Sequence, residues 1–398
     1  MAEQKLSSLR RTVVGAQFMF VAFGSTVLVP LLVGFDPAVA LLAAGLGTLL
    51  FHLITKGKVP VYLGSSFAFI APIIKATELY GMPGMFCGLV AVGVVYLLMS
   101  LLVKLLGTGF IKKLFPPVVI GPVIMLIGLS LAGTGVDMAS KNWVLALISL
   151  GVAVVCSIFG KGIVKLIPVV FGAAAGYIAA VIFYRSSMDF SAVASAPWFQ
   201  MPHFAKMSFS WQAIVFMVPV AIAPIIEHIG DVYAISEIAG KDFVQEPGLH
   251  RTMLGDGLAC SLAAFLGGAP VTTYSEVTGA VSLTKVTDPV CMRIAALFAI
   301  AISLIGKVGA AIQTIPTAVL GGIMLLLFGT IASVGINNLV KAGIDMSKTR
   351  NLIIASLILT VGIGGACISV GQFSLAGIGL ASIVGVILNL VLPEEKAN

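Results

Sequence analysis

The sequence predicts an all-α polytopic membrane protein, with fourteen transmembrane segments in two inverted repeats of seven and short extended strands interrupting segments 3 and 10. Three observations predict this fold. Hydrophobic residues make up 59% of the 398 residues and charged residues only 10%, whereas soluble domains have roughly 25% charged residues. Long apolar stretches recur along the chain. Part of the first half of the sequence also recurs in the second half.

Each apolar stretch is about as long as a segment must be to cross roughly 30 Å of hydrocarbon. The third and tenth begin near a proline and continue with β-branched or serine residues, which favour extended backbone. The predicted segments are 13–33, 37–54, 60–79, 83–106, 115–133, 142–160, 163–184, 211–230, 250–266, 269–285, 288–307, 313–334, 350–369 and 373–392.

The distribution of Lys and Arg predicts the orientation. With a cytoplasmic N-terminus, most of these residues fall in cytoplasmic connections, which is the bias found in multi-pass proteins. We therefore expect both termini to be cytoplasmic in an inner (cytoplasmic) membrane, and we expect no cleavable signal peptide. Orientation also accounts for the net charge of +7, so nucleic acid is not an expected partner. The scattered cysteines indicate neither a redox nor a metal role.

Five residues of the fifth segment recur in the twelfth at an offset of 200, which indicates an internal duplication. They are Pro116, Gly121, Leu126, Ala132 and Gly135, repeated as Pro316, Gly321, Leu326, Ala332 and Gly335. We predict a first repeat at 1–184, an extracytoplasmic connection at 185–210 and a second repeat at 211–398. Seven segments per repeat make the halves run oppositely through the bilayer, which is typical of alternating-access carriers.

The stretch 267–279 places the carboxylate of Glu276 inside an apolar segment. An ionisable group there is costly and is by default a functional-site hypothesis. Gly267, Gly268 and Pro270 disfavour a continuous helix, and irregular backbone at membrane depth is tolerated only where protein buries it or it lines a cavity. We expect Glu276 near the start of a half-helix, facing such a cavity.

Glu227 and Asp231 are spaced i, i+4 and share one face of a helix. Glu227 is expected to face the cavity, whereas Asp231 could equally lie near water at a helix end. Two carboxylates in a low-dielectric cavity do not both ionise readily, so one would hold a proton and couple solute movement to protons. We expect the remaining acids, together with His52, to lie solvated near segment ends or in loops, and His228 to serve packing.

No Lys or Arg within the segments adjoins these acids, so a neutral planar solute with N–H donors fits better than an anion. Phe67 and Tyr274 could stack on its ring, although such aromatics more often serve packing. No nucleotide-binding motif, zinc-protease motif or long soluble segment is present, so an enzyme is not expected.

Four motifs resemble the nucleobase–ascorbate transporter family, also called nucleobase:cation symporter-2, and its uracil permease branch most closely. They are Pro60–Phe69 (PVYLGSSFAF), Glu227–Asp231 (EHIGD), Pro247–Arg251 (PGLHR) and Thr272–Glu276 (TTYSE). The resemblance covers essentially the whole chain. It implies a core domain of segments 1–4 and 8–11, a gate domain of segments 5–7 and 12–14, and a homodimer.

The resemblance also assigns roles to residues. It implies that Glu227 and Glu276 bind the substrate, that Phe67 stacks on its ring, and that the backbone at Tyr274 and Ser275 reaches it. Ser25 matches a contact in the first segment, and Asp231 a proton-linked position beside Glu227. Glu276 favours a pyrimidine, because purine-type members typically carry Gln there.

Four departures bear on the substrate. Val271 and Val277 replace the Asn usual in uracil-type relatives. Phe18 and Phe328 occupy positions that are polar in some relatives. We expect a proton-coupled symporter for uracil or a close analogue, with no cofactor besides the coupling proton and no metal site. The alternatives are a xanthine or purine symporter, an anion exchanger or channel of the same fold, and a receptor that does not transport.

Overall fold

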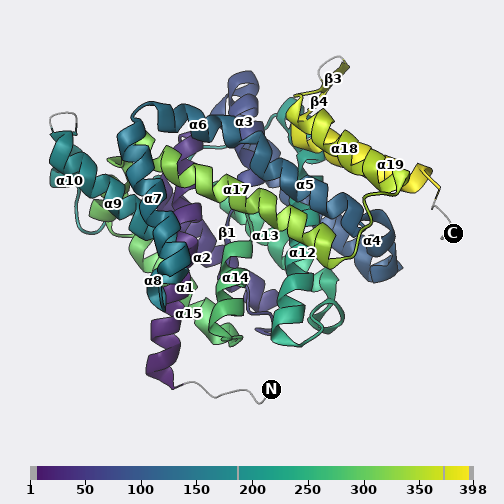
Figure 1. Ribbon diagram of the computed structural model, residues 1–398, viewed down its shortest axis with the longest axis horizontal. Helices are drawn as coiled ribbons and strands as arrows, with labels where there is room; N and C mark the ends of the chain where they lie inside the picture. Colours follow the sequence, from purple (N-terminus) through teal and green to yellow (C-terminus); the bar gives the residue numbers. More distant parts are fainter. Residues whose placement is uncertain (1–6, 186–187, 371–372, 394–398) are drawn as a thin grey trace.

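The computed structural model describes residues 7–185, 188–370 and 373–393, and most of these residues are helical (Figure 1). Residues 186 and 187 of the predicted connection lie outside the described residues. The helices of the first half are α1 (Ser8–Val33), α2 (Pro37–Ile54), the 3-10 turn η1 (Phe67–Phe69), α3 (Ile70–Leu106), α4 (Thr108–Leu114), α5 (Pro117–Ser130), α6 (Ala132–Ser140), α7 (Trp143–Phe159), α8 (Ile163–Leu166), α9 (Pro168–Phe183) and α10 (Ser191–Ser195).

The second half contains α11 (Trp211–Met217), η3 (Val218–Ala221), α12 (Ile222–Ala239), the π-helical turn η4 (Val244–Gly248), α13 (Leu249–Phe265), α14 (Ser275–Thr284), α15 (Pro289–Ser303), α16 (Gly306–Gln313), α17 (Thr317–Lys341), α18 (Thr349–Ile363) and α19 (Gly377–Val391). In the described part of the chain, 6 helical stretches are long and apolar enough to cross a membrane. Five shorter apolar helices accompany them: α7, α9, α15, α18 and α19. The chain is an integral membrane protein.

Two short strands far apart in the sequence pair near the middle of the molecule. β1 (Leu63–Ser65) runs antiparallel to β2 (Val271–Thr273), with Leu63 opposite Thr273 and Ser65 opposite Val271. All six residues are buried. β1 lies near the centre of the view in Figure 1, with helices from both halves around it. Because an isolated two-stranded ribbon is only marginally stable, the surrounding helices must hold it in place.

Glycines allow the helices of the two halves to approach closely. A Cβ at Gly121 of α5 would meet the Leu339 side chain of α17 at 2.6 Å, and one at Gly335 of α17 would meet Met125 of α5 at 2.5 Å. Small residues at such contacts let helix backbones pack against each other in membranes. The contact involves two of the predicted repeat positions, and α5 and α17 run side by side across Figure 1.

Three details differ from the predictions. The helix containing Glu227 continues to Ala239, where Gly240 in the left-handed conformation (φ 62°) ends it, rather than stopping at 230. Asp231 therefore lies within the helix and is buried. His52 is buried rather than solvated, and its Nε2 lies 3.0 Å from the carbonyl oxygen of Val61. The carbonyl belongs to Val61, which follows the turn after α2, so the residue pattern of the helix alone could not predict this contact.

A second antiparallel pair lies at the edge of the molecule. β3 (Cys367–Val370) and β4 (Phe373–Ala376) form a hairpin between α18 and α19, which pack against each other (Figure 1). The sequence predicted apolar segments at 350–369 and 373–392. The helices are shorter, because the hairpin takes residues from both.

Candidate functional site

Two helical segments begin beside the β1–β2 ribbon. Backbone hydrogen bonds extend the ribbon at both ends: Ser66 N donates to Pro270 O at 2.9 Å, and Tyr274 N donates to Tyr62 O at 3.2 Å. η1 starts one residue after Ser66, and α14 starts at Ser275. The first N–H groups of a helix have no intrahelical acceptor, so both starts present donors to a ligand or a carboxylate.

Glu276 is the second residue of α14, in the first turn, where the helix dipole favours a carboxylate. Ser25 of α1, itself buried, donates its hydroxyl to Oε1 of Glu276 at 3.1 Å. Thus Ser25 does not line the cavity described below but contacts a residue that does. The predicted contact from the first segment lies one side chain away from the cavity.

One cavity is lined by five of the predicted site residues: Phe67, Glu227, Tyr274, Ser275 and Glu276. The rest of its lining consists of Ser66, Thr272 and the aliphatic side chains Ile124, Ile331 and Val334. The cavity has room for about one water molecule. A nucleobase-sized ligand would therefore require the side chains or helices around it to move apart.

Two buried oxygen atoms in this cavity have no hydrogen-bond partner among the described residues. They are Oε2 of Glu227 and Oγ of Ser66. Ser66 occupies the position before η1, where a serine commonly caps the helix, yet its side chain makes no capping bond. Buried polar atoms are rarely left without partners, and such exceptions call for a ligand or water. Sequence reasoning did not single out Ser66.

Asp231 lies one helical turn beyond Glu227 and does not line the cavity. Its two carboxylate oxygens accept hydroxyls from the opposite side: Thr273 Oγ1 at 2.8 Å and Ser275 Oγ at 2.6 Å. Asp231 thus connects α12 to the end of β2 and the start of α14. It holds the segment that presents Glu276.

A fourth buried acid, Asp256 of α13, was missed, and the prediction that the remaining acids are solvated is wrong for it. Asp256 accepts the Thr272 hydroxyl of β2 at 2.9 Å and lies 3.2 Å from Nδ1 of His228. The other ring nitrogen of His228 lies 3.1 Å from Thr252 Oγ1. An acid in the middle of the predicted segment 250–266 was the available signal, because a buried charge needs a partner.

Tyr274 is held by its own contacts. Its hydroxyl donates to Ser65 O at 2.9 Å and accepts a hydrogen bond from Thr26 Oγ1 at 3.4 Å. The ring lies so close to Gly64 that no Cβ would fit between them, and Thr26 Oγ1 would lie 2.8 Å from such a Cβ. The phenol ring therefore packs against β1. Tyr274 is fixed by this packing and lines the same cavity as Phe67.

We predict that Gly64→Ala lowers substrate uptake about tenfold or more, because the methyl group displaces the Tyr274 ring and with it the start of α14. Gly279→Ala in α14 is the matched control, since a Cβ there meets nothing within 4 Å. Uptake by both variants at equal membrane abundance checks the prediction. Equal uptake by Gly64→Ala and Gly279→Ala would contradict it.

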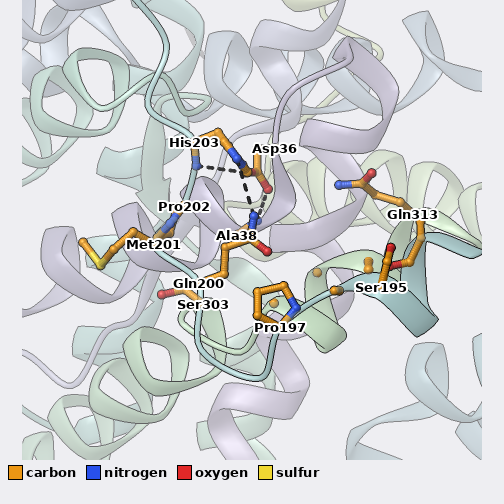
Figure 2. Close-up of a pocket in the computed structure, with 15 residues that line it drawn as sticks. Asp36, Ala38, Ser195, Pro197, Gln200, Met201, Pro202, His203, Ser303 and Gln313 are labelled. Carbon is orange, nitrogen blue, oxygen red and sulfur yellow. Dashed lines mark hydrogen bonds and ion pairs between the residues drawn. The ribbon is translucent and has the colours of Figure 1, made fainter.

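A second pocket, of about 380 Å³, lies near the start of α2 and contains none of the predicted site residues (Figure 2). Asp36 caps α2 through Ala38 N at 2.8 Å, and its other oxygen accepts His203 N–H at 3.2 Å. Figure 2 shows these contacts tying the chain at 200–203 to α2. Within the described residues no three His, Cys, Asp or Glu side chains group to hold a metal ion.

The comparisons with known proteins show the family of the chain. The permease family model matches residues 10–371. The chain belongs to this family. The resemblance to the nucleobase–ascorbate transporters is thereby confirmed, and the protein is a membrane permease.

The permease has close relatives among curated bacterial proteins. A probable uracil permease of Pasteurella multocida (strain Pm70) is 50% identical over 400 residues, covering 97% of this chain and 94% of the relative. A uracil permease of Bacillus caldolyticus is 46% identical over 393 residues, covering 95% of this chain and 90% of the relative. Both therefore match nearly the whole permease.

Solved structures share the fold at low sequence identity. The transmembrane domain of the cyanobacterial bicarbonate transporter BicA matches with a TM-score of 0.66 and 14% identity, covering 96% of this chain and 97% of that one. The murine Solute Carrier 26 family member A9 anion transporter, in its inward-facing state, matches with a TM-score of 0.71 and 12% identity, covering 97% of this chain and 68% of that one. At this identity the likeness describes the fold alone.

Proposed function

We propose that the permease is a proton-coupled symporter that imports uracil or a closely related nucleobase by alternating access. The observation that carries the proposal is the cavity in which Glu227 and Glu276 converge, with Oε2 of Glu227 and Oγ of Ser66 lacking protein partners. A flat solute edge with N–H and C=O groups would satisfy both a carboxylate and a hydroxyl. No Lys or Arg lines the cavity among the described residues.

A pyrimidine is the favoured substrate class. The relatives with about half of their residues identical are named as uracil permeases. Val271 and Val277 are buried but do not line the cavity. Val271 packs against α2, where a Cβ at Gly47 would lie 3.1 Å from Val271 Cγ2. The two valines therefore lie outside the cavity lining, and the names of the relatives favour uracil over xanthine.

Glu227 and Asp231 are the groups we assign to proton coupling. Glu227 and Glu276 share one buried cavity, where two negative charges would repel each other and lose hydration, so loading a neutral base favours a shared proton. Asp231 is held by two hydroxyls, whereas Glu227 has a free oxygen at the cavity. We assign the proton taken up with the substrate to Glu227, with Asp231 fixing the position of α14.

The architecture proposed for this mechanism follows the resemblance: fourteen crossings in two inverted repeats, a core carrying Glu227 and Glu276, a gate that includes α5 and α17, and a homodimer. The cavity supports this division, because the core segments supply all of its polar lining and α5 and α17 supply the aliphatic wall. Separating these two groups of helices would open the site.

Uptake of radiolabelled uracil into liposomes tests the proposed function. With an outside pH about one unit below the inside, we expect accumulation that a protonophore abolishes and that a sodium gradient at equal pH does not reproduce. Xanthine should compete poorly. Uracil uptake without dependence on the pH gradient would contradict proton coupling, and absence of any uracil uptake would contradict the substrate.

A further inference from the structure

The cavity has two chemically different sides. Residues from η1, α12, β2 and α14 give it carboxylates, hydroxyls and aromatic rings. The residues from α5 and α17 are Ile124, Ile331 and Val334, which offer no hydrogen bonds to a ligand. The aliphatic wall can therefore select ligands only by shape.

Phe328 lies behind this wall, one helical turn before Ile331 on α17. Its side chain is 2% exposed. Its ring centroid is 5.9 Å from that of Phe67, and the rings are perpendicular. Edge-to-face aromatic pairs of this geometry are attractive beyond the area they bury. Phe67 lines the cavity, so Phe328 limits where the Phe67 ring can go.

Phe328 has a fixed place relative to α5 and α6. A Cβ at Gly128 of α5 would collide with the carbonyl oxygen of Phe328 and lie 2.8 Å from Ala332 N. On the other side, the Phe328 ring is 3.5 Å from the position of a Cβ at Gly135 of α6. The backbone of α17 at Phe328 is therefore packed directly against α5, so the Phe328 ring moves only together with α5 and α17.

We propose that Phe328 sets the size limit of the substrate: when α5 and α17 close over a base bound at Phe67, the Phe328 ring occupies the space beside Phe67, which leaves room for a single six-membered ring and excludes a bicyclic purine. This inference rests on the proposed function and adds a specificity-determining residue outside the cavity lining. Replacing the ring by a methyl group leaves a void in which Phe67 can rotate. The second ring of a purine then gains room, while Glu227 and Glu276 remain in place.

Competition against radiolabelled uracil uptake, with binding measured on the purified full-length protein, tests this inference. For Phe328→Ala we expect the affinity for xanthine or hypoxanthine to rise about tenfold or more, with uracil affinity within about threefold of the parent. Phe328→Leu should show a smaller gain of about threefold. Leu327→Ala is the matched control, because Leu327 is a buried neighbour on the same helix that does not line the cavity.

The outcomes separate the inference from the proposed function. Retained uracil uptake by Phe328→Ala without a gain in purine affinity overturns the size limit, as does an equal purine gain in Leu327→Ala. If Phe328→Ala does not fold, Phe328→Leu decides, and an unchanged purine affinity there overturns it. A parent protein that takes up xanthine as readily as uracil also overturns it. A parent protein that takes up no nucleobase removes the proposed function and this inference together.

Discussion

Glu276→Gln is expected to reduce uracil uptake about 10- to 100-fold, because a hydrogen bond to a charged group contributes about 1.5–3 kcal/mol. The amide has one oxygen acceptor where the carboxylate has two, and it places N–H donors beside Ser25 and the N–H groups at the start of α14. Both effects weaken a site that must accept N–H groups of a base. The substitution preserves side-chain volume, so packing of the buried segment should change little.

Initial uptake rates and uracil-dependent thermal stabilisation together check this prediction. Glu237→Gln is the matched control on α12, since Glu237 is 71% exposed in its side chain and 3.6 Å from Lys341. We expect parent-like uptake from that variant. If Glu276→Gln transports and binds uracil as the parent does, Glu276 is not a substrate ligand.

Asp256→Ala is expected to lower the free energy of unfolding by about 1–3 kcal/mol, the usual cost of leaving a buried hydrogen-bonding group without its partner. The change would leave His228 and the Thr272 hydroxyl without their shared partner in a site where all three are buried. Thr272 belongs to β2 and lines the cavity. Loss of stability should therefore be accompanied by loss of uracil binding.

Thermal unfolding in detergent measures the effect, with an expected fall of the midpoint of several degrees, since 1 kcal/mol shifts it by roughly 2–4 °C in proteins of 150–250 residues and by less in longer ones. Asp137→Ala in α6 is the control, because Asp137 is exposed and its substitution should change stability by about 0.5 kcal/mol or less. An Asp256→Ala variant as stable as Asp137→Ala would show that the contact with His228 contributes little.

The helical membrane architecture and the acids of the cavity could be predicted because each depends on local sequence. A carboxylate in an apolar segment beside Pro270 is conspicuous, and the i, i+4 spacing of Glu227 and Asp231 puts both on one helix face. The β-branched residues of the tenth segment likewise favour the extended backbone found in β2.

The pairing of β1 with β2 could not be predicted, because strands so far apart carry no local signal for their register. The contact of Phe67 with Phe328 could not be predicted for the same reason. Nor could the sequence show which acid lines the cavity and which is held by hydroxyl groups. The two hydroxyl donors of Asp231 belong to Thr273 and Ser275, which are distant in the sequence, so the pattern around Asp231 does not indicate them. Asp256 was overlooked, although its place within a predicted transmembrane segment already called for a buried partner.

The proton inventory of uracil binding tests the central claim most directly. Calorimetric titration of the purified protein in two buffers with different ionisation enthalpies gives the number of protons bound with uracil. The account predicts uptake of about one proton near neutral pH, and less in Glu227→Gln, whose side chain cannot take up that proton. Uracil binding with the same enthalpy in both buffers, and no difference between the parent and Glu227→Gln, would contradict it.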